Sequence, residues 1–148
     1  MRFDTSILSV LMAGFATASP VSENPSSLAK RAQYDMCGDS TFDNHSTGGS
    51  PLVKDCQKIT RNIAGDGRWD LTVRHRQVVQ YGTCAFGAEI VGQLTAGYIG
   101  NTDIIDLIND SINKFQWEGK VGAAGEMSCK SLSGRFSDAR VRWGIYHT

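Results

Sequence analysis

The spacing of apolar residues predicts a first helix that begins near Ser50 and ends before Gly65. Ser50 is a residue type favoured at the N-cap, and Pro51 suits the first helical position. Gly65 and Gly67 favour termination. The apolar face consists of Leu52, Val53, Cys56, Ile59 and Ile63. Because Cys56 lies in the middle of this face, a disulfide there would fix the helix to whatever it packs against.

A second helix is predicted to begin near Asn101-Thr102 and to stop at Gly119. Asp103 falls in its first turn, where the helix dipole favours a negative charge. The apolar face consists of Ile104, Ile105, Leu107, Ile108, Ile112 and Phe115. Trp117 falls on the polar side, with Asp106, Asp110 and Asn113. An outward Trp near a helix end is either an interface anchor or a cover for the following loop.

Alternating apolar and polar residues predict strands at 69–74, 126–130 and 140–147. Residues 78–91 are also β-rich but too long for one typical strand, and Gly82 and Gly87 indicate bulges or bends. Residues 37–49 are expected to form a short extended segment and a polar loop, and the region around Gly97 and Gly100 a glycine-rich loop. The order helix, two strands, helix, two strands favours an α+β fold, with two helices on one face of a roughly four-stranded antiparallel sheet.

The N-terminal region has the pattern of a secretory leader. Arg2 precedes an apolar stretch at 7–15 that ends in small residues, and this stretch is too short to span a bilayer. A Ser/Pro-rich segment follows and ends at Lys30-Arg31, a dibasic pair of the kind that kexin-type proteases cut in the fungal secretory pathway. We therefore expect a signal peptide at 1–18, a pro-segment at 19–31 and one folded domain at 32–148.

Four cysteines occur in the expected folded domain, at Cys37, Cys56, Cys84 and Cys129. In a secreted protein they predict two disulfides, with three possible pairings. There is no C-x-x-C pair, so neither a zinc site nor another metal or cofactor is expected. A formal net charge of +0 argues against nucleic acid as a partner. Asn44-His45-Ser46 and Asn109-Asp110-Ser111 are sequons for N-glycosylation.

The sequence favours binding over catalysis, and no residue is assigned as catalytic. The chain lacks a Ser-His-Asp signature and a phosphate-cradling glycine pattern. A secreted ribonuclease would need a His, a carboxylate and an Arg converging on one phosphate. The best such set is His147, Glu89 and Arg142, which the predicted strands place on neighbours.

Two basic patches are further candidates for binding. Lys54, Lys58 and Arg61 form the polar face of the first helix, which is either a solvated face or a contact for acidic lipid or wall polymer. Arg74 and Arg76 flank His75 at a predicted hairpin tip, an arrangement similar to the way toxins present a basic side chain to a channel mouth. We expect a monomer.

Six segments carry a resemblance to a known family: CGDSTF (37–42), SPLVKDC (50–56), YGTCAFG (81–87), GNTDIID (100–106), VGAAGEMSC (121–129) and WGIYH (143–147). They resemble the necrosis-inducing factor domain of fungi, which is named after the extracellular protein 2 effector of the tomato leaf-mould fungus. The similarity runs from about Cys37 to His147 and includes all four cysteines.

The resemblance implies a fungal protein secreted into host tissue, a virulence factor of a plant pathogen that provokes host cell death or is recognised by resistant plants. The family is also similar, more distantly, to the fourth type of killer toxins, which have an α/β sandwich and block calcium channels. That similarity implies the pairs Cys56–Cys84 and Cys37–Cys129. No catalytic motif comes with the family. Two functions follow: a non-enzymatic effector that binds a host protein or membrane component and triggers necrosis, or a killer-toxin-like antimicrobial that blocks ion channels of competing fungi. A ribonuclease-like enzyme is a third alternative.

Overall fold

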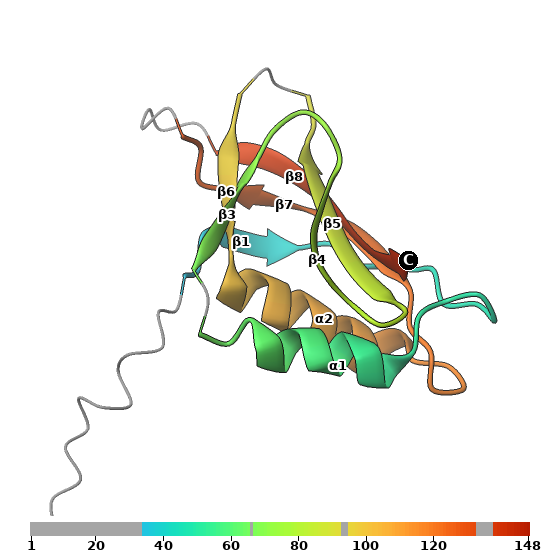
Figure 1. Ribbon diagram of the computed structural model, residues 1–148. Helices are drawn as coiled ribbons and strands as arrows, with labels where there is room; N and C mark the ends of the chain where they lie inside the picture. Colours follow the sequence, from blue (N-terminus) through green and yellow to red (C-terminus); the bar gives the residue numbers. More distant parts are fainter. Residues whose placement is uncertain (1–33, 66, 93–94, 133–137) are drawn as a thin grey trace, which may run out of the picture.

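The computed structural model describes residues 34–65, 67–92, 95–132 and 138–148 (Figure 1). Within them, two helices and eight strands form an α+β fold, as predicted. The helices are α1 (Val53–Asn62) and α2 (Asn101–Phe115). The strands are β1 (Cys37–Ser40), β2 (Asp43–Asn44), β3 (Arg68–Leu71), β4 (Arg76–Tyr81), β5 (Cys84–Ile90), β6 (Gly97–Gly100), β7 (Ala123–Cys129) and β8 (Ala139–His147). The predicted leader, the pro-segment and Lys30-Arg31 lie outside the described residues.

The main sheet is larger than the four strands predicted. Its order is β1-β7-β8-β5-β4, with β2 also paired to β7, and β3 and β6 form a second, two-stranded sheet. All these pairs are antiparallel. Residues 37–49, predicted as a short extended segment and a polar loop, add β1 and β2 to the main sheet. Two further regions also differ from the prediction. Residues 78–91 were expected as one bent segment, but Gly82 adopts φ +54° in a turn that separates β4 from β5. The region around Gly97 and Gly100 was expected as a loop, but it pairs with β3 as β6.

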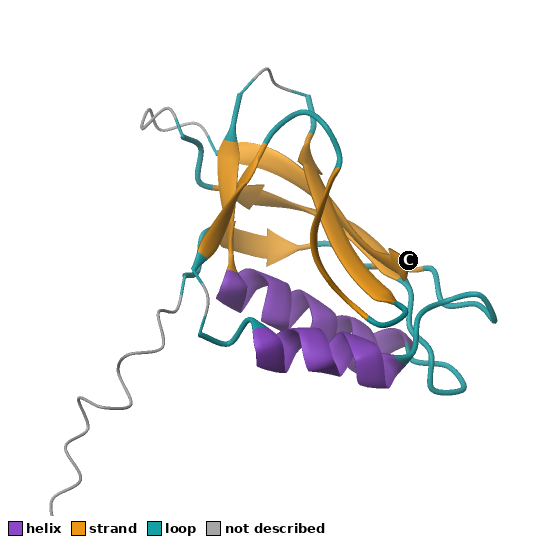
Figure 2. Ribbon diagram, in the orientation of Figure 1, coloured by secondary structure: helices purple, strands orange, loops and turns teal. Residues whose placement is uncertain are grey.

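The helices and the sheet enclose one core. The two helices lie side by side on the same side of the sheet (Figure 2). Alternate residues of β8 are buried, because successive side chains of a strand point to opposite faces. Trp143 is central to this core. Its ring stacks on the ring of Phe86, with 6.0 Å between the ring centroids, and meets the ring of Phe42 edge-on, with 5.4 Å between the centroids. The opposite face of the sheet carries the charged pair Glu126 and Arg142.

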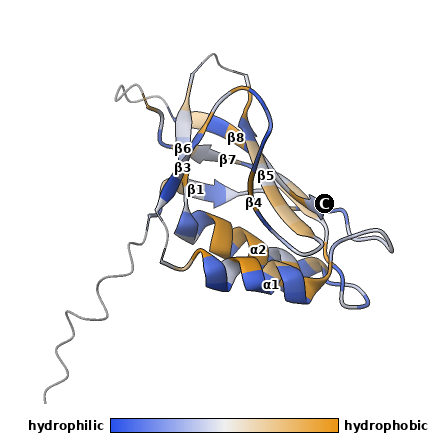
Figure 3. Ribbon diagram, viewed as in Figure 1, coloured by the Kyte–Doolittle hydropathy of each residue, from blue (hydrophilic) through white to orange (hydrophobic). Residues whose placement is uncertain are grey.

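The first helix starts later than predicted, and Ser50 is not its N-cap. Leu52 holds that position, and its backbone N–H donates to the hydroxyl of Thr83, 2.9 Å away. Ser50 is buried, and its hydroxyl instead donates to the carbonyl of His45 and accepts from the N–H of Thr47. The predicted apolar faces do face the core: Cys56 and Ile59 are buried in α1, and hydrophobic positions recur along both helices (Figure 3). A side chain from a distant turn thus completes the start of α1.

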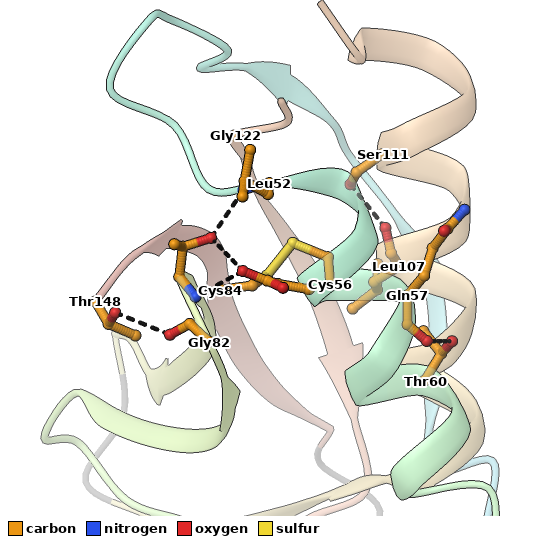
Figure 4. The surroundings of a disulfide bond; sticks show 12 residues. Leu52, Cys56, Gln57, Thr60, Gly82, Cys84, Leu107, Ser111, Gly122 and Thr148 are labelled. Carbon is orange, nitrogen blue, oxygen red and sulfur yellow. Dashed lines mark hydrogen bonds between the residues drawn. A yellow bond between two sulfur atoms is a disulfide. The ribbon is translucent and has the colours of Figure 1, made fainter. Parts of the chain in front are cut away.

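Two disulfides tie the elements together. Cys37–Cys129 joins residues directly opposite each other on β1 and β7. Cys56–Cys84 joins α1 to the start of β5 (Figure 4). These are the pairs that the killer-toxin similarity implies. The four cysteines are the only ones in the chain, so the described domain has no free thiol.

Candidate functional site

An acidic groove of about 580 Å³ lies between β1 and α2. Five carboxylates line it: Asp35, Asp39, Asp103, Asp106 and Asp110. Three of them follow one another on α2 at spacings of three and four residues, which places them on one face of the helix. The sequence therefore contained a signal for this groove. What it did not contain was the position of β1, which supplies the opposite wall.

Asp103 is the buried member of the groove. Its carboxylate accepts hydrogen bonds from three backbone N–H groups: Gly100 at 2.7 Å, Met36 at 3.0 Å and Cys37 at 3.2 Å. Burial raises the pKa of Asp103 to about 6, against the opposing effect of these donors. The carboxylate thus fixes the start of α2 to the edge strand β1. Because its pKa is about 6, it gains a proton and loses its charge in mildly acidic solution.

The other carboxylates of the groove are more accessible. Partial burial, with the nearby charges of Asp110 and Asp35, raises the pKa of Asp106. Asp110 pairs with Lys114 at 3.6 Å. Such a concentration of negative charge in a concave surface attracts cationic groups. Within the described residues, no group of three or more His, Cys, Asp and Glu side chains is arranged to hold a metal ion.

The hypothetical ribonuclease set does not converge. Glu89 and Arg142 are directly opposite each other on β5 and β8, and their side chains approach to 3.6 Å. His147 lies five residues further along β8, roughly 16 Å away at the rise of a strand. It also points to the opposite face of the sheet from Arg142, because five is an odd separation. The guanidinium of Arg142 also forms a salt bridge with Glu126 at 3.2 Å. This alternative is therefore wrong for these three residues.

The two basic patches have different environments. Lys54 and Arg61 are exposed on α1 and Lys58 is partly exposed, as predicted for a polar helix face. Arg74 and Arg76 are both exposed, but they do not lie at a hairpin tip. The segment between β3 and β4 connects two different sheets, so no hairpin forms there. The guanidinium of Arg76 donates to the carbonyl of Asp70 at 3.0 Å, which holds it along this connection.

Trp117 lies beyond the end of α2 rather than on the helix. It is 50% exposed, the largest value among the exposed large hydrophobic side chains of the described residues. The sequon residues Asn44 and Asn109 are both exposed as well, Asn44 in β2 and Asn109 on α2. Both are therefore accessible to modification in the folded domain.

Comparison with known families settles the classification. Residues 36–129 match the model of the Hce2 family, described as "Pathogen effector; putative necrosis-inducing factor". This chain belongs to the Hce2 family. The match runs from the residue before β1 to the end of β7, so it includes both helices and all four cysteines of this Hce2 domain.

Two curated relatives come from the fungus Penicillium expansum. "Probable chitinase LysM18" is 39% identical over 115 residues, which is 74% of this chain. "Secreted chitinase LysM12" is 34% identical over 119 residues, which is 76% of this chain. The matched region is only 8% of the length of each of those two proteins.

Several findings together indicate an extracellular protein of a fungal effector family. They are the family, the two disulfides and the relative that is named as secreted. Neither helix of the described residues is long and apolar enough to cross a membrane.

Proposed function

We propose that this Hce2 domain is a fungal effector that is released into the host apoplast, binds a host protein or membrane component, and thereby induces plant cell death. The observation that carries the proposal is the family match over residues 36–129. The two disulfides support it, because cross-links of this kind preserve a small domain among extracellular proteases.

The acidic groove is the surface that we assign to the host target. Asp39 and Asp106 are exposed there, so a partner can reach them without unfolding of the domain. A partner surface rich in Lys or Arg would be attracted to this groove, and the association would weaken with salt. The exposed basic residues of α1 provide a matched control on another element.

Leaf infiltration with purified domain tests the proposal. We expect necrosis with the wild type, none with the double variant Asp39→Asn/Asp106→Asn, and full necrosis with Lys54→Gln/Arg61→Gln. Circular dichroism and disulfide mapping verify that each variant folds. Absence of necrosis with the wild type in susceptible plants contradicts the effector function. Full necrosis with the groove variant contradicts the assignment of the surface alone.

A second candidate function is a killer-toxin-like antimicrobial that blocks ion channels of competing fungi. The relatives favour it, because both carry the matched region as a small part of a protein named as a chitinase. Chitin is a polymer of fungal walls, so a domain that accompanies a chitinase is well placed to act on fungal cells. Growth inhibition of fungal cultures, measured in parallel with leaf infiltration, separates the two functions. Inhibition without leaf death favours the antimicrobial function, and the opposite result favours the effector.

A further inference from the structure

A second pocket, of about 420 Å³, lies between the loop after β2 and the turn after α2. Its lining includes Asn44, Phe115, Gln116 and Trp117. The two segments that form it run side by side at one end of the molecule (Figure 1). A pocket of this volume suits a small ligand or one unit of a polymer.

The wall that carries Trp117 is held in place by the backbone. The N–H of Trp117 donates to the carbonyl of Lys120 at 2.8 Å, and the N–H of Lys120 donates back to Trp117 at 2.9 Å. The N–H of Gln116 donates to Ile112 in the last turn of α2. The half-exposed indole is therefore presented by a defined turn. Trp117 is 50% exposed to water, and a ligand with an apolar face would gain free energy by covering the indole.

The opposite wall is tied to the first. The hydroxyl of Ser46 donates to the carbonyl of Phe115 at 2.7 Å, and it accepts from the N–H of Gly122 at 3.0 Å. The ammonium group of Lys120 also contacts the carbonyl of Gly48. Both walls thus keep their separation without a ligand, and a preformed pocket loses little entropy on binding.

The lining suits an uncharged ligand with amide groups. No carboxylate is among the described residues that line this pocket. Its Lys114 is already paired with Asp110 and lies over the ring of Phe42, 4.6 Å from the centroid. Gln116 contributes a carboxamide that donates and accepts hydrogen bonds. The carboxamide oxygen of Asn44 already accepts the N–H of Ser46 at 2.9 Å, so Asn44 offers its NH2 group as a donor. An acetamido group has the same donor and acceptor pair, and a pyranose ring has an apolar face that matches an indole.

We propose that this pocket binds one N-acetylhexosamine ring, with the apolar face of the sugar on Trp117 and the acetamido group on the carboxamides of Asn44 and Gln116. Hydrolysis of a glycosidic bond requires two carboxyl groups about the bond. The lining supplies neither, so the pocket holds the sugar without cleaving it. This site is separate from the acidic groove, and its failure leaves the proposed effector function untouched.

The ring has two possible sources with the same chemistry. One is an external chain of N-acetylglucosamine units. The other is the first sugar of a glycan on Asn44, because the sequon asparagine is part of the lining. That sugar is joined through Nδ2 of Asn44, so its acetamido group would meet the carboxamide of Gln116 alone. Protein made with and without N-glycosylation distinguishes the two.

The first experiment uses protein secreted into the bacterial periplasm, which has its disulfides but no N-glycan. Tetra-N-acetylchitotetraose is titrated by calorimetry and by tryptophan fluorescence, with cellotetraose as the sugar that lacks acetamido groups. We expect a dissociation constant on the order of 1 mM for the first and at least tenfold weaker binding of the second. Trp117→Ala should weaken binding at least tenfold, and Tyr81→Ala, at another exposed aromatic, should not.

Three results overturn the proposal: no binding at millimolar concentration, equal binding by Trp117→Ala, or equal binding of cellotetraose. The second experiment repeats the titration with protein from a glycosylating yeast, after mass spectrometry has located a glycan on Asn44. Loss of tetrasaccharide binding, with Trp117 emission already shifted in the free protein, assigns the pocket to the protein's own glycan. Unchanged binding assigns it to an external saccharide.

Discussion

Asp55 on α1 accepts two hydrogen bonds from Thr83, one from the backbone N–H at 2.9 Å and one from the hydroxyl at 2.7 Å. The same hydroxyl accepts the N–H of Leu52 at the start of the helix. Asp55 and Thr83 directly precede the two cysteines of the second disulfide. The hydrogen bonds from Thr83 also lower the pKa of Asp55, those from the backbone most. The hydrogen bonds of Thr83 with Asp55 and Leu52, here called the Thr83 clasp, thus join α1 to the start of β5 beside the disulfide.

Replacement of Thr83 tests the contribution of the Thr83 clasp to stability. Thr83→Val keeps the shape of the side chain but removes its hydroxyl, so Leu52 loses its acceptor and Asp55 loses one donor. We expect the free energy of unfolding to fall by about 1 kcal/mol, the usual net contribution of a hydrogen bond. Urea unfolding with intact disulfides measures it. Thr83→Ser retains the hydroxyl and should remain near wild-type stability; equal loss in both variants would refute the role of the hydroxyl.

The two disulfides should contribute unequally to stability. They close loops with sequence separations of 92 for Cys37–Cys129 and 28 for Cys56–Cys84. Chain entropy then gives roughly 5 kcal/mol for the longer loop and roughly 4 kcal/mol for the shorter one. We expect Cys37→Ala/Cys129→Ala to be the less stable of the two double variants in guanidinium unfolding. The reverse order would mean that packing of the buried Cys56 and Cys84 outweighs loop closure.

The buried indole N–H of Trp143 is satisfied by a hydrogen bond to Ser40. Its indole N–H donates to the hydroxyl of Ser40 at 2.7 Å, and the Trp143 side chain is 2% exposed. Ser40→Ala leaves this buried donor unpaired, so we expect a loss of about 1–3 kcal/mol in the free energy of unfolding. Ser128→Ala, at an exposed position on β7, is the matched control and should change stability by less than about 0.5 kcal/mol. Similar losses in the two variants would contradict this role for Ser40.

Asp103 should make stability depend on pH in a defined direction. Its pKa in the folded domain is raised from 3.8 to about 6, so the folded state binds more protons than the unfolded state between these values. The slope of unfolding free energy with pH is then negative. The contribution of Asp103 is greatest below about pH 4 and is lost as the pH rises through 6.

A carbon NMR titration of the Asp103 carboxyl group measures this pKa directly, and we expect a midpoint near 6. Denaturation at several pH values between 4 and 7 gives the linked stability; Asp55, whose pKa is lowered, acts in the opposite direction at lower pH. A midpoint near 4 for Asp103 would mean that its three backbone donors outweigh its burial.

The periodicity of apolar residues along the chain was enough to predict the helices and strands that bury one face. The apolar stripe of residues 104–115 predicted α2, and the alternation at 140–147 predicted β8, because a repeat of 3.6 or 2 residues specifies which side chains share a face. The four cysteines and the six segments around them likewise identified the family without any structure.

Tertiary structure decided what depends on partners distant in sequence. Gly97–Gly100 has no strand pattern of its own and is a strand because β3 pairs with it. Ser50 has the chemistry of an N-cap, but Leu52 holds that position, and its N–H donates to Thr83 because the β4–β5 turn packs on the helix. The groove of Asp103 and the pocket of Trp117 each need two walls from separate parts of the chain. A linear pattern encodes each wall, and only packing brings the two walls together.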